Sequence, residues 1–177
     1  MSDSLERRDS EARTASGSQE EVQRFLSFSL CNEEYAVPLL KVREVIALPD
    51  ITSVPHTPAH FKGIMNLRGQ IISVIDLRLK FKMAKADTTQ ETAVIILDIA
   101  AASLGVVVDS IDSVLAVETS NISDTPDIES VITSDYITGV TRKDKKLVLL
   151  LDIERTLSVE DMSTMRHQQS KQPKIAA

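Results

Sequence analysis

Two histidines, His56 and His60, are the side chains best suited to hold a metal ion, because they are four residues apart. On a helix this spacing places both imidazoles on one face, as in half of a zinc site. Pro55 and Pro58 disfavour a continuous helix here, since proline lacks a backbone N–H and clashes with the preceding turn. A third ligand is also missing from the pattern. We therefore expect no metal site and interpret both histidines as surface or loop-packing residues.

Acid–base chemistry would need neighbouring carboxylates, and the candidates are Asp98, Asp109 and Asp112. Asp109 and Asp112 are predicted at the end of a strand and in the turn after it, where aspartate commonly accepts hydrogen bonds from backbone N–H groups. We therefore interpret these aspartates as structural. Cys31 is the only cysteine, so it cannot form an intramolecular disulfide, and a structural role is expected for it as well.

Motifs of the common enzyme classes are missing from the sequence. Its five glycines are too far apart to form a loop that cradles phosphate. Walker A, dinucleotide-binding, nucleophile-elbow and zinc-protease patterns are also absent. These absences disfavour an enzyme and no cofactor is expected, while a small hydrolase or metal enzyme built on β-barrels stays open as the less favoured alternative.

Composition limits both the core and the partners. Hydrophobic residues make up 42% of the 177 residues but aromatic residues only 3%, so the core is expected to consist of Val, Ile and Leu, which suit strands. The net charge of −6 disfavours nucleic acid as a partner. Apolar runs such as residues 93–97 are far shorter than the roughly 20 residues that span a bilayer. We predict a cytoplasmic protein with no direct membrane insertion.

The elements expected to position these side chains are short strands. Leu26, Phe28 and Leu30 alternate with serines, which is typical of a half-buried strand. Further strand-like runs cover residues 35–37, 71–77, 93–99, 104–108, 114–117 and 147–151. Their spacing favours an all-β barrel or sandwich. Residues 1–23 have little apolar content and are predicted to be a flexible tail.

An internal repeat organises the chain. Shifted by 69 positions, residues 25–30 fall on 94–99 and residues 42–47 on 111–116; shifted by 76, residues 71–81 fall on 147–157. We predict a first β-barrel over residues 24–90 and a second over 91–157. A unit of that size buries only about 60% of its unfolded surface and is marginal alone, so the two are expected to pack together. The groove between them is the expected place for a ligand.

Residues 158–177 are predicted to form a short C-terminal helix and a tail. Ser158 and Asp161 have the spacing of a capping box, and Val159, Met162 and Met165 share one helical face. Asp76 and Asp152, at equivalent positions of the repeat, are expected to cap short helical turns.

Positions that differ between the two copies are candidates for a specific surface. Glu44, Lys62, Asn66 and Arg68 correspond to Ser113, Thr138, Arg142 and Asp144. Glu44 and Arg68 carry opposite charges and could form a bidentate pair that fixes two loops of the partner groove. The alternative is two unrelated solvated charges, and the sequence leaves this choice open.

The chain resembles the CheW family. The segments that carry the resemblance are FLSF (25–28), EYAV (34–37), KVREVI (41–46), PHTPAHFKGIMNLRG (55–69), IDLR (75–78), LGVVVD (104–109) and YITGV (136–140). The match runs from about residue 25 to 157, and residues 55–69 are its most specific part. The resemblance implies two pseudo-symmetric five-stranded SH3-like barrels, with strands near the boundaries packing across them.

The resemblance also implies a function without catalysis. The expected role is an adaptor, or scaffold, for chemotaxis signal transduction that joins the cytoplasmic tip of chemoreceptors to the regulatory domain of the CheA histidine kinase, at receptor arrays on the inner face of the membrane. Kinase contact is expected at the end of a barrel, on residues that the sequence does not assign. An adaptor in another receptor–kinase array, for surface motility or development, is the alternative. The receptor-binding residues carried over by motif are Val42, Glu44, Lys62, Gly63, Asn66 and Arg68.

Overall fold

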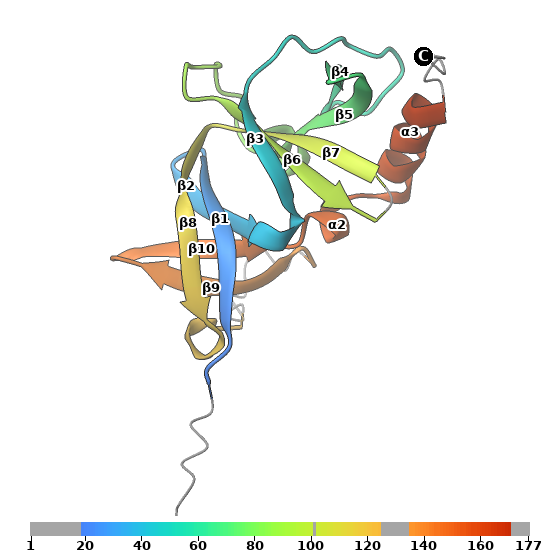
Figure 1. Cartoon of the computed structure of the whole chain (residues 1–177). Helices are drawn as coiled ribbons and strands as arrows, with labels where there is room; N and C mark the ends of the chain where they lie inside the picture. The colour runs from blue at the N-terminus through green and yellow to red at the C-terminus, as the bar shows by residue number, and fades with distance from the viewer. Residues whose placement is uncertain (1–18, 101, 125–134, 171–177) are drawn as a thin grey trace, which may run out of the picture.

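The computed structural model describes residues 19–100, 102–124 and 135–170, which form mainly antiparallel strands with short helices (Figure 1). The elements are β1 (Val22–Leu30), β2 (Glu33–Pro38), the 3-10 turn η1 (Leu39–Lys41), β3 (Val42–Ala47), β4 (Phe61–Leu67), β5 (Gln70–Asp76), α1 (Leu77–Lys80), β6 (Ala93–Ile99), β7 (Ala102–Val108), β8 (Ser110–Glu118), the 3-10 turn η2 (Thr119–Asn121), β9 (Ile137–Lys143), β10 (Lys146–Leu151), α2 (Ile153–Thr156) and α3 (Val159–Ser170).

The strands form two five-stranded sheets. One has the order β3-β6-β7-β5-β4, and the other has the order β8-β1-β2-β10-β9. Side chains at the two edges of each sheet meet, as in a barrel: Arg68 bonds Glu44 across the first sheet, and Lys143 bonds Ser113 across the second. We call the first the central barrel, since its strands are consecutive from β3 to β7, and the second the terminal barrel, since it combines both ends of the chain. The all-β fold of two five-stranded barrels predicted from the sequence is thus confirmed.

The barrels do not follow the linear limits 24–90 and 91–157. The central barrel lies within residues 42–108, and the terminal barrel combines β1 and β2 with β8, β9 and β10. Each boundary is displaced by one hairpin, because β1 and β2 pair with β8 and β10 rather than with strands of their own copy. The packing of strands across the boundary, which the family resemblance implied, accounts for this difference.

The internal repeat relates the two barrels strand by strand. Each barrel combines the first hairpin of one copy of the repeat with the last three strands of the other copy. The registers agree as well: Leu149 pairs with Tyr35 in the parallel ladder of the terminal barrel, and the equivalent Ser73 pairs with Leu104 in the central barrel. The pseudo-symmetry therefore holds at the level of individual residues.

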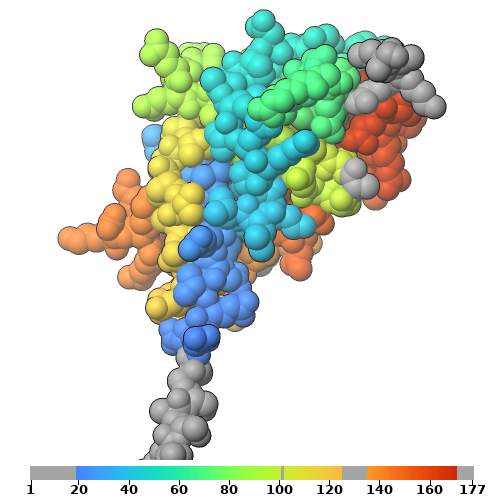
Figure 2. All heavy atoms as spheres, viewed as in Figure 1, coloured from blue at the N-terminus to red at the C-terminus, as the bar shows by residue number. Residues whose placement is uncertain are grey.

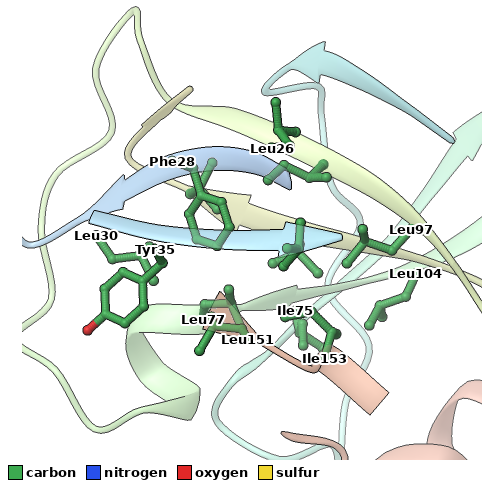
Figure 3. Packing of buried hydrophobic residues seen from close by; sticks show 14 of the residues in the cluster. Leu26, Phe28, Leu30, Tyr35, Ile75, Leu77, Leu97, Leu104, Leu151 and Ile153 are labelled. Atoms are coloured by element: carbon green, nitrogen blue, oxygen red, sulfur yellow. The ribbon is translucent and has the colours of Figure 1, made fainter. Parts of the chain in front are cut away.

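The largest hydrophobic cluster lies between the barrels, in a layer that we call the seam. It joins side chains of β1 and β2, such as Phe28 and Val37, to side chains of β6 and β7, such as Leu97 and Leu104. Figure 3 shows side chains from both barrels meeting in this layer. Smaller clusters fill each barrel, around Ile72 in the central one and Phe25 in the terminal one.

Burial on both faces explains the composition of the seam strands. In β6, Val94 and Ile96 point into the central barrel while Ile95 and Leu97 point into the seam, so the strand is almost continuously apolar. By contrast, half-buried and exposed residues alternate along β3. The two faces of the seam strands leave little room for polar residues.

The chain ends differ in part from the expectation. Val22 and Gln23 belong to β1 rather than to the predicted tail, and the rest of that tail up to residue 18 lies outside the described residues, as do residues 171–177. The predicted C-terminal helix is present as α3, which lies beside β5 of the central barrel (Figure 1). Of the three residues predicted to share one helical face, Met165 is buried and Met162 is partly buried, but Val159 is 88% exposed. No helix among the described residues is long and apolar enough to span a bilayer.

A buried carboxylate holds α3 in place. Ser158 and Asp161 form the predicted capping box, with Ser158 N–H donating to Asp161 Oδ2 at 2.8 Å. Asp161 Oδ2 also accepts from Lys80 Nζ at 2.6 Å, and Asp161 Oδ1 lies 2.5 Å from His60 Nε2. Burial alone would raise the pKa of Asp161, but the hydrogen bonds from Lys80, Ser158 and His60 outweigh it and lower the pKa to about 2. Asp161 is therefore ionised at neutral pH and anchors the first turn of α3.

Candidate functional site

The seam has one open side, at the junction of η1, β6, β10 and α2. A cleft of ≈ 150 Å³ lies there, which we call the seam cleft; its lining residues are Val37, Pro38, Lys41, Leu97, Ile99, Thr138, Leu151, Asp152, Ile153 and Glu154. Both barrels contribute walls. The walls are mainly aliphatic, so the cleft can receive apolar groups.

An ion pair crosses the rim of the seam cleft. Lys41 Nζ on η1 donates to Glu154 Oε1 on α2 at 2.8 Å. This hydrogen bond raises the pKa of Lys41, and it lowers the pKa of Glu154, which also accepts a bond from the backbone N–H of Ala100. Since both side chains are half exposed, water screens the pair, and it can open at little cost.

The other side of the seam is closed by the chain itself. Arg78, with a side chain only 3% exposed, reaches Asp76 at 3.4 Å and Asp109 Oδ1 at 3.0 Å. Its Nη1 also donates to the carbonyl of Ala86 in the segment between α1 and β6. Met83 of that segment packs against the seam cluster. A buried ion network and a covering segment thus occupy the place that is open on the opposite side.

Close to the open side, β3 and the β4–β5 hairpin carry the pair predicted from the repeat. Arg68 Nη1 and Nη2 donate to Glu44 Oε1 and Oε2 at 2.7 and 2.9 Å, which is bidentate geometry. The hydrogen bond from Arg68 lowers the pKa of Glu44 and raises that of Arg68. The sequence left open whether these residues meet, and the structure brings them together.

The remaining candidates divide between two ends of β4. Val42 lies two residues before Glu44 on β3 and packs partly against the seam cluster. The Oδ1 of Asn66 accepts from the backbone N–H of Gly69 at 2.8 Å, so Asn66 shapes the hairpin that presents Arg68. Val42, Glu44, Asn66 and Arg68 therefore share one region.

Lys62 and Gly63 lie at the opposite end of β4, towards the closed side. Lys62 Nζ is 3.9 Å from Asp76 Oδ2. Gly63 has φ +143°, and a Cβ added there would lie 2.1 Å from the carbonyl oxygen of Thr52. Only glycine fits this approach of two backbones, so the fold itself accounts for Gly63.

Comparison with known proteins identifies the family of this chain. A family model described as a CheW-like domain matches residues 24–161. This chain belongs to the CheW family. Among its relatives, the chemotaxis protein CheW of Klebsiella aerogenes is 37% identical over 141 residues, covering 80% of this chain and 85% of that protein. The chemotaxis protein CheW of Treponema pallidum is 30% identical over 146 residues, covering 79% and 85%.

A solved structure agrees with this assignment. The scaffolding protein TtCheW from Thermoanaerobacter tengcongensis superposes with a TM-score of 0.73 at 29% sequence identity, covering 80% of this chain and 96% of that one. CheW proteins are non-catalytic scaffolds that couple chemotaxis receptors to the kinase CheA, and this chain is such an adaptor.

Residues weighed for catalysis have separate structural partners in this CheW fold. Asp98 accepts from Ser103 Oγ, Asp109 from the backbone N–H of Cys31, and Asp112 from Ser29 Oγ. Among the described residues, no three His, Cys, Asp or Glu side chains gather as metal ligands. The interpretation of Asp109 as a structural residue that accepts a backbone N–H is confirmed.

Sequence reasoning missed the residues that make the two sides of the seam different. Arg78 lies in the IDLR segment (75–78), but no role was predicted for it, and no ion pair was predicted between Lys41 and Glu154. The available signal was the repeat: Arg78 and Glu154 occupy equivalent positions with opposite charges, 76 residues apart. A charge reversal at equivalent positions indicates that each position has a different partner.

Proposed function

We propose that the cytoplasmic hairpin tip of chemoreceptors binds beside the open side of the seam, on the surface formed by Val42, Glu44 and Arg68. The observation that carries the proposal is the bidentate pair between Arg68 and Glu44, which lies next to a partly exposed valine. Arg68 is 73% exposed at its side chain, and its guanidinium keeps free N–H groups after bonding Glu44. An apolar contact beside a fixed, charged group suits the apolar face of a helix with a polar flank.

The six residues carried over by motif have different roles in this proposal. Val42 supplies apolar contact, and Arg68, held by Glu44, sets the register of the receptor helix. Asn66 supports the surface through its bond to the Gly69 backbone, and Gly63 does so by allowing β4 to approach Thr52. Lys62 is one-third exposed at the far end of β4, where it would contact a more distant part of the receptor.

Kinase binding is assigned to a separate surface, because an adaptor has to hold both partners at once. We infer that the regulatory domain of CheA binds at the end of a barrel, and that the assembly forms in the cytoplasm at receptor arrays on the inner face of the membrane. The strand β3 (cyan) and the strands β1 and β8 (blue and yellow) share one face in Figure 2, so the two barrels present neighbouring but distinct surfaces. Coupling then requires that the contacts differ between the active and inactive kinase.

Two substitutions test the receptor surface. Arg68→Ala removes the charged group, and Val42→Asp places a carboxylate in the apolar contact. Each is expected to weaken receptor pull-down by about tenfold or more, since a charge at a desolvated contact is costly. Kinase pull-down is the control for both variants and is expected to be unchanged. The thermal unfolding midpoint is expected to stay close to wild type for Arg68→Ala and to fall for Val42→Asp, because Val42 packs partly against the seam cluster. Normal receptor binding by both variants would contradict the assignment.

A further inference from the structure

Asp109 joins the two barrels on the closed side of the seam. It is the single residue between β7 of the central barrel and β8 of the terminal barrel. Its Oδ1 lies 3.0 Å from Nη1 of Arg78, which belongs to α1 of the central barrel. Its Oδ2 accepts from the backbone N–H of Cys31 at 2.8 Å, and its own N–H donates to the carbonyl of Ser29 at 3.0 Å, both in the terminal barrel. One residue thus bonds both barrels at the point where the chain passes between them.

Arg78 is held in place by two more partners. Its Nε lies 3.4 Å from Asp76 Oδ1 at the end of β5, and its Nη1 donates to the carbonyl of Ala86 at 3.1 Å. The side chain of Arg78 is 3% exposed. Because this network lies largely out of water, its contacts are screened far less than those of a surface ion pair. The guanidinium is therefore a fixed point of the central barrel.

The repeat shows that the fold itself does not require this contact. Both short helices keep their capping aspartate. Arg78, however, corresponds to Glu154, and Asp109 corresponds to Leu40, which is 99% exposed. At the equivalent place on the open side, the same backbone is thus built with a glutamate and an exposed leucine. The contact between Arg78 and Asp109 needs an explanation beyond the shared fold.

The closed side has what is needed to select one angle between the barrels. Burial of the seam is driven by the hydrophobic effect, which is non-directional and favours contact between the barrels more than any one angle. Buried polar contacts are directional, since a rotation would leave the guanidinium of Arg78 without its partners. On the open side, the half-exposed pair of Lys41 and Glu154 costs little to break. We therefore look to Arg78 and Asp109 for the orientation of the barrels.

We propose that the contact between Arg78 and Asp109 is a positioning element that sets the angle between the two barrels, and that the adaptor passes receptor signals to the kinase through this fixed angle. This rests on the separate receptor and kinase surfaces of the proposed function, but not on the residues of either surface. A movement at one surface reaches the other only through a body that keeps its shape. Arg78 and Asp109 touch neither partner and act by holding the barrels.

Two variants weaken the contact with little change of shape. In Asp109→Asn the amide has one acceptor oxygen, which can serve the N–H of Cys31 or face Arg78, but not both, and its NH₂ group meets a donor on the other side. Arg78→Lys keeps the positive charge, but an ammonium group lacks the planar fork that reaches several partners at once. The lysine variant provides the same test if the asparagine variant does not fold.

Two control variants separate the angle from other effects. Glu154→Gln makes the same change from acid to amide on the open side, where it breaks the pair with Lys41. Val74→Ala removes two methyl groups inside the central barrel, away from the seam cluster, and lowers stability alone. Neither control touches the contact between Arg78 and Asp109.

Residual dipolar couplings of the backbone N–H groups measure the angle between the barrels. In wild type and both controls, the couplings of the two barrels are expected to fit one alignment tensor. In Asp109→Asn and Arg78→Lys each barrel is expected to need its own tensor. In a reconstituted mixture of adaptor, receptor fragment and kinase, Asp109→Asn is expected to reduce the receptor-controlled change in kinase activity about fivefold or more, and the controls to stay within about twofold. Pull-down of each partner is expected to be unchanged.

Three outcomes would overturn the proposal. The first is one alignment tensor in both Asp109→Asn and Arg78→Lys, and the second is an altered angle with normal control of the kinase. The third is an equal loss of kinase control in Val74→Ala at a matched unfolding midpoint, because lost stability would then explain the effect. The receptor surface is tested separately by pull-down with Arg68→Ala, and its failure would leave the measured angles unaffected.

Discussion

The two sides of the seam are built from equivalent elements but have opposite properties. On the closed side, α1 presents a buried arginine to Asp76 and Asp109, and the following segment covers it. On the open side, α2 presents the exposed Glu154 to Lys41, and a cleft remains. The backbone symmetry is nearly complete, so the difference resides in a few side chains and in where the chain goes next. A duplicated fold can thus keep one side for stability and leave the other for a partner.

Substituting the equivalent aspartates should show the largest contrast between the two sides. Asp76 caps α1 and pairs with Arg78 in the interior, whereas Asp152 caps α2 near the surface. Asp76→Ala leaves a buried guanidinium short of a partner and is expected to cost about 3–5 kcal/mol of unfolding free energy. Asp152→Ala loses a helix cap and an exposed ion pair with Arg155, together about 1 kcal/mol. Urea unfolding measures both, and equal losses would contradict the assignment of a closed and an open side.

The equivalent glycines provide the second contrast. At Gly63 a Cβ would lie 2.1 Å from a backbone oxygen, and φ is +143°; at Gly139 the nearest atom, 2.7 Å away, is a methyl group of Ile122. A side chain yields more easily than a backbone, so Gly63→Ala is expected to cost about 3 kcal/mol and Gly139→Ala about 1 kcal/mol. Thermal unfolding of the two variants and the wild type under the same conditions gives the ratio of the two stability losses. A larger loss at Gly139 would reverse the expected order.

Substituting Asp161, which anchors α3, should change the free energy of unfolding least among these tests. The size of the change should depend on pH. The pKa of Asp161 is about 2 in the folded protein, below its ordinary value of 3.8, so its stabilisation is present above pH 4 and is lost as the pH falls towards 2. Asp161→Asn is expected to lower the unfolding free energy by on the order of 2 kcal/mol at pH 5. The difference between wild type and variant should close near pH 2.

Urea titrations at pH 5, 3.5 and 2 follow that difference, and measuring the variant beside the wild type cancels the other carboxyl groups. A gap that stays constant across this range would mean that Asp161 acts through packing rather than through its charge. The same variant also reports on the seam, because a released α3 would no longer draw the chain after α2 away from the open side.

Much of the fold could be predicted because the two copies of the repeat can be aligned with each other. The strands and the capping roles of Asp76 and Asp152 follow from residues that agree between the copies. The pairing of Glu44 with Arg68 was suggested by positions at which the two copies of the repeat carry different residues. What the repeat could not decide is which copy completes which barrel, since both arrangements contain the same strands in the same order.

A physical signal for the strand exchange was nonetheless present in the sequence. Residues 93–97 are continuously apolar, whereas residues 42–47 include Arg43 and Glu44, and continuous runs indicate strands covered on both faces. The open side was harder to foresee. Lys41 and Glu154 are not related by the repeat, and their meeting depends on how the two barrels pack.

The strands of the central barrel lie in the sequence between the first hairpin and the last three strands of the terminal barrel, and this order has a consequence for synthesis on the ribosome. All strands of the central barrel have been translated by Val108, but the terminal barrel waits for β10, which ends at Leu151. The first hairpin therefore emerges with its apolar seam face, which includes Phe28 and Val37, and stays without its final partners while more than a hundred residues follow. At roughly 5–20 residues per second this exposure lasts several seconds, long enough for chaperones to bind the nascent chain.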